Sequence, residues 1–369
     1  MHLTVTREQL LKPLSAVHSV VARGSDAFSN PILGNFLFEV KPDRLTVTAS
    51  DLVVELSSSM ALNNASAGTI TLPGRKLLDI VRELPDATAI SITTDKDMAI
   101  LKSPSGYYKL ATLPAKDFPR VTLDDIKRKV RIEAPTLRTL MERSLHAMGK
   151  DDARAFLNGL CLEIREGRFY SVGTDGHRLA VASTPIAADT AGMRVVIPRK
   201  GAQELFALIQ AYDQPIDLEL GMRNLSLSLP DTVYITSLID AKFPDYWEVI
   251  PSYSGQDIYV GRQALLEAVQ RADIMNENGK RSVAIAVSPN TIKVMSTNAK
   301  EENATDAIDA QTSIPELLLG CNAAYLLDAL RATPTDDIRL AVRNASTSIV
   351  LTPRVGAEDL TQVIMPVRL

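Results

Sequence analysis

The segment Thr6-Arg7-Glu8-Gln9-Leu10-Leu11 has two counterparts further along the chain, Thr136-Leu137-Arg138-Thr139-Leu140-Met141 and Arg262-Gln263-Ala264-Leu265-Leu266. A second helix-like segment, Gly74-Arg75-Lys76-Leu77-Leu78-Asp79-Ile80, recurs as Arg199-Lys200-Gly201-Ala202-Gln203-Glu204-Leu205 and as Cys321-Asn322-Ala323-Ala324-Tyr325-Leu326-Leu327. The copies end at Phe118-Pro119-Arg120, Phe243-Pro244-Asp245 and Met365-Pro366-Val367. This period of roughly 120 residues is the size of a whole domain, well above that of a solenoid repeat. The repeat therefore predicts three similar domains in tandem.

Apolar residues in both sets of segments follow helical spacing. In the first set they are Leu10, Leu14, Val17 and Val21 in copy one and Leu137, Met141, Leu145 and Met148 in copy two. In the second set they are Leu77, Ile80, Val81 and Leu84, then Leu205, Leu208 and Ile209, then Leu326, Leu327 and Leu330. Thr6 and Gln9 match a capping box, which predicts that the first helix starts there. Pro13 predicts a kink or an early end of that helix.

Short alternating runs rich in Val, Ile and Thr separate the helices, for example residues 44–49, 89–93 and 224–229. Their alternation predicts half-buried antiparallel strands that outnumber the helices. Each repeat is then expected to be an α+β unit, with two helices packed on antiparallel sheet. We place the domains at residues 1–125, 126–251 and 252–369, with linkers at 124–129 and 251–256. Because both linkers are short, we expect the domains to form one fixed object.

Composition describes an ordinary globular protein. Of the 369 residues 46% are hydrophobic, and no stretch approaches the length and apolarity of a membrane span. The first residues, Met1-His2-Leu3-Thr4-Val5-Thr6, lack the pattern of a secretory signal, so we expect a cytoplasmic protein. Cys161 and Cys321 are the only cysteines and lie far apart, which argues against a disulfide framework and excludes a cysteine zinc cluster. The formal net charge of −4 argues weakly against polyanion binding by the whole surface.

The string Val172-Gly173-Thr174-Asp175-Gly176-His177-Arg178-Leu179-Ala180 is the sharpest local motif. An Asp/His catalytic pair or a metal site is one interpretation. Asp175-Gly176 is also a good two-residue turn between strands, and a single histidine lacks the partners that a metal needs. The counterpart in copy one, Ala49-Ser50-Asp51-Leu52-Val53-Val54, keeps the aspartate without a histidine. A turn that contributes to a binding surface is the favoured interpretation.

No nucleotide-binding loop is evident. Gly279-Lys280-Arg281-Ser282 resembles the end of a phosphate loop but lacks the preceding glycine and the strand-to-helix context. The histidines at positions 2, 18 and 146 are scattered without ligand spacing. The sequence offers no convincing active site, metal site or cofactor site.

Basic residues open the second helix of two repeats, at Arg75-Lys76 and Arg199-Lys200. A cation in the first turn opposes the helix dipole by ~0.3–1 kcal/mol, so its repetition suggests an external anion, although a solvated charged turn is equally open. Further basic residues fall on the first helices and their exits: Arg138, Arg143, Lys150, Arg154, Arg262 and Arg271. If these helices face one side, the residues form a track suited to the backbone of duplex DNA.

Several strings together resemble one known family, the bacterial DNA polymerase III beta subunit, or sliding clamp. They are Pro31-Ile32-Leu33-Gly34-Asn35, Phe156-Leu157-Asn158-Gly159, the 174–180 motif, Pro198-Arg199-Lys200-Gly201, Lys242-Phe243-Pro244-Asp245-Tyr246 and Met365-Pro366-Val367-Arg368-Leu369. Their order is that of the family, and the resemblance covers the whole length. It implies three domains of one fold per chain and two chains closed head to tail into a ring of six domains.

The resemblance also implies the function. A clamp encircles duplex DNA without sequence specificity, slides along it and tethers the replicative polymerase, and it is not an enzyme. Its partners are a second copy of the chain, the polymerase alpha subunit, the subunits of an ATP-driven clamp loader and other proteins with a clamp-binding motif. No cofactor is implied.

A peptide-binding groove between the second and third domains follows from the same resemblance, suited to a short peptide with Gln and Leu/Phe anchors. Carried over to this chain, its residues are Leu157, Thr174, Gly176, His177, Arg178, Leu179, Pro244, Val249, Asn322, Tyr325, Ser346, Ser348, Val363, Met365, Pro366, Val367 and Arg368. Many relatives carry basic residues where this chain has Trp247 and Glu248, so we expect the rim of the groove to differ in size and charge.

Two further sets of residues follow from the resemblance. The ring interface pairs Tyr108 and Leu110 with Ile274 and Met275, assisted by Lys76 opposite Glu301 or Glu302. The expected DNA-facing residues are Arg23, Arg75, Lys150, Arg154, Arg199, Lys200, Lys280 and Arg281.

Two alternatives of other classes stay open. A nucleic-acid-processing enzyme with Asp175 and His177 in its site would show metal-dependent turnover, and the absence of clustered carboxylates near the histidine in the sequence counts against it. A structural repeat scaffold that does not bind DNA leaves the repeated Arg-Lys pairs unexplained.

Overall fold

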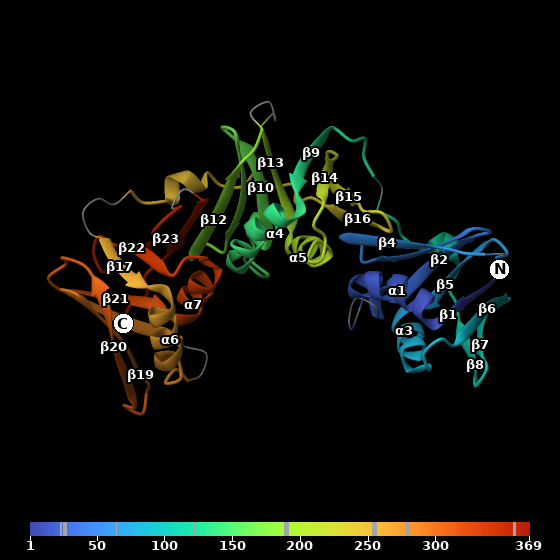
Figure 1. Cartoon of the computed structure of the whole chain (residues 1–369), viewed down its shortest axis with the longest axis horizontal. Coiled ribbons are helices and arrows are strands. Elements are labelled where there is room, and N and C mark those ends of the chain that lie inside the picture. The colour runs from blue at the N-terminus through green and yellow to red at the C-terminus, as the bar shows by residue number, and fades with distance from the viewer. Residues whose placement is uncertain are drawn as a thin grey trace. The chain divides into compact units, whose positions relative to one another are not determined.

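The computed structural model describes residues 1–22, 24, 28–63, 65–121, 123–187, 192–252, 257–277, 281–356 and 359–369. They form two compact units, Met1–Glu133 with Asp213–Leu238, and Ala134–Tyr212 with Ile239–Leu369. Figure 1 shows helices and antiparallel strands in both units. The α+β class with three tandem repeats is therefore confirmed at the level of the elements, while the three domain boundaries stay predictions.

The first unit holds the first repeat and four strands of the second. Its strands are β1 (His2–Thr6), β2 (Asn35–Lys41), β3 (Arg44–Ser50), β4 (Val54–Ala61), β5 (Gly68–Pro73), β6 (Ala89–Asp95), β7 (Met98–Ser103), β8 (Gly106–Ala111), β9 (Arg128–Glu133), β14 (Pro215–Leu220), β15 (Asn224–Ser228) and β16 (Thr232–Ser237). They form a four-stranded sheet, β1-β6-β7-β8, and an eight-stranded sheet, β5-β2-β3-β4-β16-β15-β14-β9. The helices are α1 (Arg7–Val17) and α3 (Gly74–Glu83).

The start of α1 matches the sequence prediction. Thr6 is the N-cap: its hydroxyl accepts from the Gln9 N–H at 3.3 Å, while the Gln9 side chain accepts from the Thr6 N–H at 2.9 Å. This reciprocal pair satisfies two amide groups that the helix leaves without partners. Leu10 and Leu14 of α1 are fully buried, and α1 packs on α3, β3 and β4. Each fully buried leucine contributes roughly 1.5–3 kcal/mol to the stability of this layer.

The second unit holds the remainder of the second repeat and the whole of the third. Its strands are β10 (Gly159–Arg165), β11 (Arg168–Thr174), β12 (Arg178–Pro185), β13 (Met193–Pro198), β17 (Asp257–Gly261), β18 (Ser282–Ser288), β19 (Thr291–Thr297), β20 (Asn303–Gln311), β21 (Leu317–Asn322), β22 (Asp337–Ala341), β23 (Ile349–Pro353) and β24 (Leu360–Ile364). They pair in the order β13-β10-β11-β12-β24-β23-β22-β17-β20-β19-β18-β21. The helices are α4 (Ala134–Glu142), α5 (Arg199–Leu208), α6 (Arg262–Asp273) and α7 (Ala323–Ala332).

Strands pair across the boundaries of the repeats. In the first unit β16, the last strand of the second repeat, pairs with β4, the fourth strand of the first repeat. In the second unit β24, the last strand of the third repeat, pairs in the same way with β12 of the second. The compact units therefore cut through the middle repeat, because its strands belong to two continuous sheets.

Three details differ from the sequence prediction. The apolar stripe of α1 runs on to Val21, but the α-helix ends at Val17 and a 3-10 turn follows over His18–Val20. The stripe of α4 likewise continues past the last helical residue, Glu142, into a 3-10 turn at Leu145–Ala147. Apolar side chains in such a turn face the core as a helical stripe would, so periodicity alone places the ends too late. The third copy of the second helix begins at Ala323, since the two residues before it belong to β21.

The described helices are all too short or too polar to cross a membrane.

Candidate functional site

The turn between β11 and β12 carries the string that the sequence singles out. One carboxylate oxygen of Asp175 accepts from the N–H groups of His177 at 2.9 Å and Arg178 at 3.0 Å, and the Thr174 hydroxyl accepts from the Gly176 N–H at 3.2 Å. Gly176 has φ of +86°, where a side chain is disfavoured. The connection has three residues between the strands instead of the predicted two. Asp175 thus holds the turn by its oxygen, as the turn interpretation requires.

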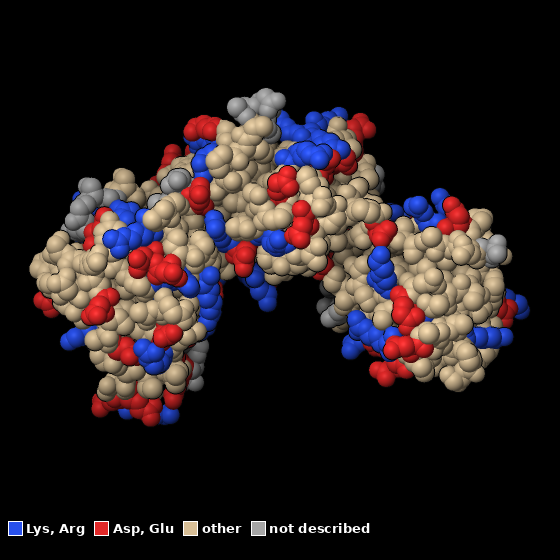
Figure 2. Space-filling model, viewed as in Figure 1, with Lys and Arg blue, Asp and Glu red and all other residues tan. Residues whose placement is uncertain are grey.

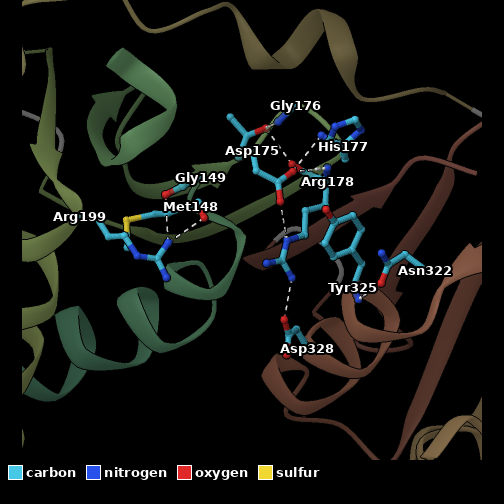
Figure 3. A network of polar contacts seen from close by, with 11 residues as sticks. Met148, Gly149, Asp175, Gly176, His177, Arg178, Arg199, Asn322, Tyr325 and Asp328 are labelled. Carbon is cyan, nitrogen blue, oxygen red and sulfur yellow. Dashed lines mark hydrogen bonds and ion pairs between the residues drawn. The ribbon is translucent and has the colours of Figure 1, made fainter. Parts of the chain in front are cut away.

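Arg178 ties this turn to helix α7 (Figure 3). Its Nε donates to Asp175 at 3.0 Å and its Nη1 to Asp328 of α7 at 2.7 Å. The guanidinium also lies 4.4 Å from the ring centroid of Tyr325, within the range of a cation–π interaction. The side chain is 13% exposed. Two carboxylates and one ring therefore hold the guanidinium in place, so its position is defined before any ligand arrives.

His146 lies beside this network and is neutral at pH 7. Burial, with the nearby Arg178 guanidinium as the second cause, lowers the pKa of the His146 imidazole from 6.5 to about 4. Its Nδ1 is one of the few buried side-chain atoms without a hydrogen-bond partner in the described part of the chain. A neutral ring avoids placing a second positive charge next to the buried guanidinium.

A cavity of about 240 Å³ opens next to the turn. Its walls are mostly apolar, with Arg178, His177 and Ser348 among the polar groups. The predicted groove residues that line it are Leu157, Thr174, Gly176, His177, Arg178, Leu179, Pro244, Val249, Ser348, Val363 and Met365. Met365 is 47% and Val249 59% exposed, which leaves both apolar side chains available for contact with a ligand.

The other predicted groove residues do not line the cavity: Asn322, Tyr325, Ser346, Pro366, Val367 and Arg368. Asn322 instead caps α7, with its side-chain oxygen accepting from the Tyr325 N–H at 3.2 Å, and Tyr325 supports Arg178. Ser346 belongs to an exposed turn that Asn344 stabilises.

Three lining residues escaped the sequence prediction, namely Arg154, Phe156 and Tyr246. Phe156 precedes Leu157, and Tyr246 ends the Lys242–Tyr246 string, so proximity to quoted motifs was the available signal. Arg154 was expected to face DNA. It pairs with Asp152 at 3.0 Å, and these hydrogen bonds hold the pKa of the Asp152 carboxyl at about 2.

A cluster around the buried Glu163 carboxylate supports the wall of the cavity. The Tyr246 hydroxyl donates to Glu163 at 2.6 Å, and Arg194 donates to the other oxygen of that carboxylate from Nε at 3.0 Å and Nη2 at 2.7 Å. Glu163 is 6% exposed. Burial, and then the neighbouring carboxylate, raises the pKa of the Tyr246 phenol. The hydrogen bond between Tyr246 and Glu163 holds the 3-10 turn Tyr246–Val249 in place, and Tyr246 and Val249 of this turn line the cavity.

Trp247 and Glu248 do not form the rim of the cavity as the sequence predicted. The indole packs on Tyr246, with ring centroids 4.9 Å apart, and on Tyr170 at 5.3 Å, and the Arg165 guanidinium lies over the indole ring at 5.9 Å from its centroid. Neither Trp247 nor Glu248 is among the lining residues. In a 3-10 turn successive side chains point in different directions, so the neighbours of a lining residue face away from the cavity.

The residues expected to face DNA have mixed surroundings. Arg75 is 85% exposed near Asp79, and Lys150 is exposed. Arg199 donates to the carbonyl oxygens of Met148 at 2.9 Å and Gly149 at 3.0 Å, so this cation does have a local structural partner, contrary to the sequence argument. Lys200 is half-buried with a polar partner, and Arg281 pairs with Asp273. Arg23 and Lys280 lie outside the described residues.

The expected interface residues differ in exposure. Ile274 is 73% exposed, whereas Met275 and Tyr108 are half-buried. Leu110 is only 8% exposed and offers less surface than expected. The three charged residues of the set, Lys76, Glu301 and Glu302, are exposed.

The first repeat carries the same turn, but a different residue follows it in the next strand. Asp51 accepts from the N–H groups of Val53 at 3.0 Å and Val54 at 2.7 Å, as Asp175 does in the second repeat. The strand register places Glu55 of the first repeat at the position of Leu179. Glu55 is 1% exposed and accepts from Arg120 at 2.9 Å. A buried carboxylate, paired with an arginine whose side chain is 46% exposed, therefore stands where the second repeat presents an apolar side chain to the cavity.

A larger cavity of about 670 Å³ lies in the first unit near the start of α3. Gly74 lines it and occupies the position of Arg199, since Pro73 and Pro198 pair with the first residues of β2 and β10. Arg199 thus has no side-chain counterpart in the first repeat, where a Cβ atom at Gly74 would lie 3.1 Å from the Val21 side chain.

The repeats, the continuous sheets and the cavity beside the 174–178 turn define a three-domain repeat protein with a mostly apolar cavity. The chain matches three family descriptions in order: DNA polymerase III beta subunit, N-terminal domain at residues 1–123, central domain at 131–245 and C-terminal domain at 247–368. The chain therefore belongs to the DNA polymerase III beta subunit family, the bacterial beta sliding clamps, whose members are processivity factors of DNA replication.

Individual relatives match over their full length. The chain is 37% identical to the beta sliding clamp of Haemophilus influenzae and 36% identical to that of Vibrio cholerae, and each alignment covers 100% of both chains. It also superposes on a crystal structure of the sliding clamp of Pseudomonas aeruginosa bound to griselimycin, with a TM-score of 0.93 and 34% identity over 100% of both chains. The resemblance drawn from the sequence strings is thereby confirmed.

Proposed function

We propose that two copies of this chain form a closed ring that encircles duplex DNA in the cytoplasm and tethers the replicative polymerase by short peptides, without catalysis of its own. Membership of the sliding-clamp family supports the processivity role. The observation that carries the ring is the repeated rule of strand pairing between neighbouring repeats.

Under this rule two strands of the described part are left without a neighbouring repeat to pair with, so they can pair with a second copy of the chain. Within the chain the last strand of each later repeat pairs with the fourth strand of the repeat before it, as β16 does with β4 and β24 with β12. Two strands of the described part remain without such a partner. They are β8, at the edge of its sheet, and β20, whose residues Asn303–Asp309 pair only with β19. The same kind of pairing joins β20 of one chain to β8 of the next. Two chains then supply six repeats, and the ring closes because each repeat is rotated by the same angle from the one before it.

The in-chain junctions also predict the register of this new pair. Ser58 pairs with Thr232 in the first junction. The hairpin registers make Thr232 equivalent to Gly106, and Ser58 equivalent to Asp306. The proposed interface therefore sets Gly106 of one chain opposite Asp306 of the other, and Tyr107 opposite Thr305. The lysine of β8, at position 109, then approaches the acidic start of β20, which follows Glu301 and Glu302.

Cysteine cross-linking tests this register. Directly opposed residues of antiparallel strands have Cα atoms within disulfide range, whereas residues displaced by two positions do not. Tyr107→Cys with Thr305→Cys should therefore give a covalent dimer under mild oxidation. Tyr107→Cys with Ala307→Cys is the matched control and should give little. The native Cys161 and Cys321 are buried and should not interfere. Equal cross-linking of both pairs, or of neither, would contradict the register.

Encirclement accounts for DNA binding by a protein with this charge. The surface in Figure 2 mixes Lys and Arg with Asp and Glu, and the net charge is −4. Several cations expected at the DNA, such as Arg154 and Arg281, are already paired with carboxylates. Ordinary electrostatic affinity for DNA should then be weak and salt-sensitive. A closed ring holds the duplex without strong contacts, and the exposed Arg75 and Lys150 can approach phosphates transiently.

The peptide site is the cavity beside the 174–178 turn. Its apolar walls and exposed Met365 suit leucine or phenylalanine side chains, and the fixed Arg178 and His177 offer polar groups at the edge. The volume of about 240 Å³ admits one or two such side chains rather than a folded partner. Griselimycin, bound by the Pseudomonas aeruginosa clamp, supports ligand binding by this fold.

Retention on DNA of defined topology tests the function. The protein is loaded onto nicked circular duplex by a clamp loader with ATP, and half of the sample is then linearised. Protein that stays on circles at high salt and is lost from linear DNA is held topologically. Equal retention on both forms, falling steeply with salt, would show ordinary electrostatic binding and refute encirclement.

A further inference from the structure

The last residues of the chain are anchored to the turn between β11 and β12 and to strand β21, both in the second unit. Residues 365–369 follow β24. The Met365 N–H donates to the carbonyl oxygen of His177 at 2.9 Å, and the Val367 N–H donates to that of Gly320 in β21 at 3.0 Å. Met365, which makes the first of these hydrogen bonds, lines the cavity. The course of this segment therefore decides where the Met365 side chain stands.

Gly320 permits the second anchor because it has no side chain. A Cβ atom at Gly320 would overlap the carbonyl oxygen of Val367, and it would lie 3.1 Å from the carbonyl carbon of that residue and 3.0 Å from Cγ of Leu369. The strand cannot move aside easily, since Gly320 is paired with Ala284 of β18 in the sheet. Any side chain here must displace the 365–369 segment instead. Backbone conformation is not the reason for glycine, because no positive φ is recorded at this position.

We propose that Gly320 is a positioning residue for the peptide site: its bare Cα lets the 365–369 segment cross β21 in contact and thereby fixes Met365 in the cavity wall. This inference rests on the proposed peptide-binding function. Gly320 does not touch the cavity itself. It acts through Val367, two residues beyond Met365 and on the same continuous segment.

The Gly320→Ala substitution should weaken peptide binding without unfolding the protein. The added methyl breaks the hydrogen bond to Val367 and leaves the segment held only at His177. We expect the affinity for a fluorescein-labelled peptide with Gln, Leu and Phe anchors to fall roughly tenfold, the effect of one lost positioning interaction. Gly261→Ala is the matched control in the same repeat, because a Cβ there meets only Ala264 Cβ at 3.9 Å. It should leave the affinity unchanged.

A double-mutant cycle separates positioning from a general weakening of β21. The second change is a chain that stops after Met365, which removes the atoms that the new methyl would strike. Gly320→Ala should lower affinity in the full chain and have no further effect in the shortened chain. An equal loss in both backgrounds would show that the methyl disturbs the strand itself and would overturn the inference. Unchanged affinity in the full chain would do the same.

Hydrogen exchange without peptide keeps this test independent of the proposed function. Gly320→Ala should speed exchange of the Val367 N–H by at least tenfold while amides in β18 stay protected. No change at Val367 would overturn the inference even if peptide binding fell. Faster exchange together with no binding of the labelled peptide by the unmodified protein would refute the peptide site and leave the positioning of the segment intact.

Discussion

Replacing Arg194 by methionine should leave the buried Glu163 carboxylate without its positively charged partner. Arg194 gives that carboxylate two of its hydrogen bonds, and only the one from Tyr246 would remain. Removing one partner of a buried ion pair costs ~3–5 kcal/mol. Arg194 is 29% exposed, so water can partly replace it and the lower end applies, about 3 kcal/mol. Methionine keeps most of the apolar stem, which isolates the effect of the charge.

Trp247 allows this loss of stability to be measured by fluorescence close to the cluster. It is the only tryptophan of the chain, and its ring lies 4.9 Å from that of Tyr246. Urea unfolding followed by tryptophan fluorescence therefore reports the structure around the cluster. With slopes of about 1–3 kcal/mol per molar urea, a loss of about 3 kcal/mol lowers the midpoint of unfolding by roughly 1–3 M.

Two further variants test whether the unpaired charge of Glu163 causes the loss of stability. Arg271→Met removes an arginine that also gives two hydrogen bonds to one carboxylate, that of Asp306, at 3.0 and 3.1 Å, but Arg271 is 52% exposed. It should cost below about 1 kcal/mol. Adding Glu163→Met to Arg194→Met should recover at least half of the loss, because no uncompensated charge is left. A double variant as unstable as the sum of the two single variants would refute the reasoning.

Three other variants test separate parts of the account. Met365→Asp should abolish binding of the labelled peptide by placing a charge in the apolar wall, while circular dichroism stays unchanged; full affinity would exclude this residue from the site. Charged residues at both Ile274 and Met275 should convert the dimer to monomers in sedimentation, and a dimer that persists would exclude them from the ring interface. His146 binds its proton more weakly in the folded than in the unfolded chain, so stability is complete above pH 6.5 and falls by roughly 3 kcal/mol toward pH 4. His146→Gln should reduce this fall, measured by urea unfolding across that range, and an unaltered pH dependence would show that other groups cause it.

The sequence predicted the repeated elements well because their signals are local. The capping box at Thr6, the stripe of α3 and the run at 44–49 each depend on neighbours within a few residues. The ends of the first helices were placed less well, since apolar residues in a 3-10 turn continue the stripe of the α-helix before it. The pairing of β4 with β16 was not predicted, because strands far apart in the chain leave no periodic signal.

The candidate site shows the same limit. Family strings located most of the residues that line the cavity, including Leu179 and Met365. They could not show that Asn322 caps a helix or that Trp247 turns toward Tyr170, since both depend on the direction of a side chain. Arg199 illustrates the converse error. Its partners are two backbone carbonyl groups about fifty positions away, which a sequence argument based on helix dipoles cannot see.

The equivalent position in the three repeats explains why the cavity lies where it does. The residue that pairs with the end of the third strand is Glu55 in the first repeat, Leu179 in the second and Asn303 in the third. Glu55 is buried and must keep its partner Arg120, so this junction cannot exchange that contact for an apolar ligand without leaving a buried charge unpaired. Asn303 lies in the part of β20 that pairs only with β19 among the described strands, and in the proposed ring a second chain covers this edge. Leu179 alone presents an apolar side chain at a junction already closed within one chain. The proposed peptide site would therefore be complete in each monomer, and a ring of two chains would carry two of them.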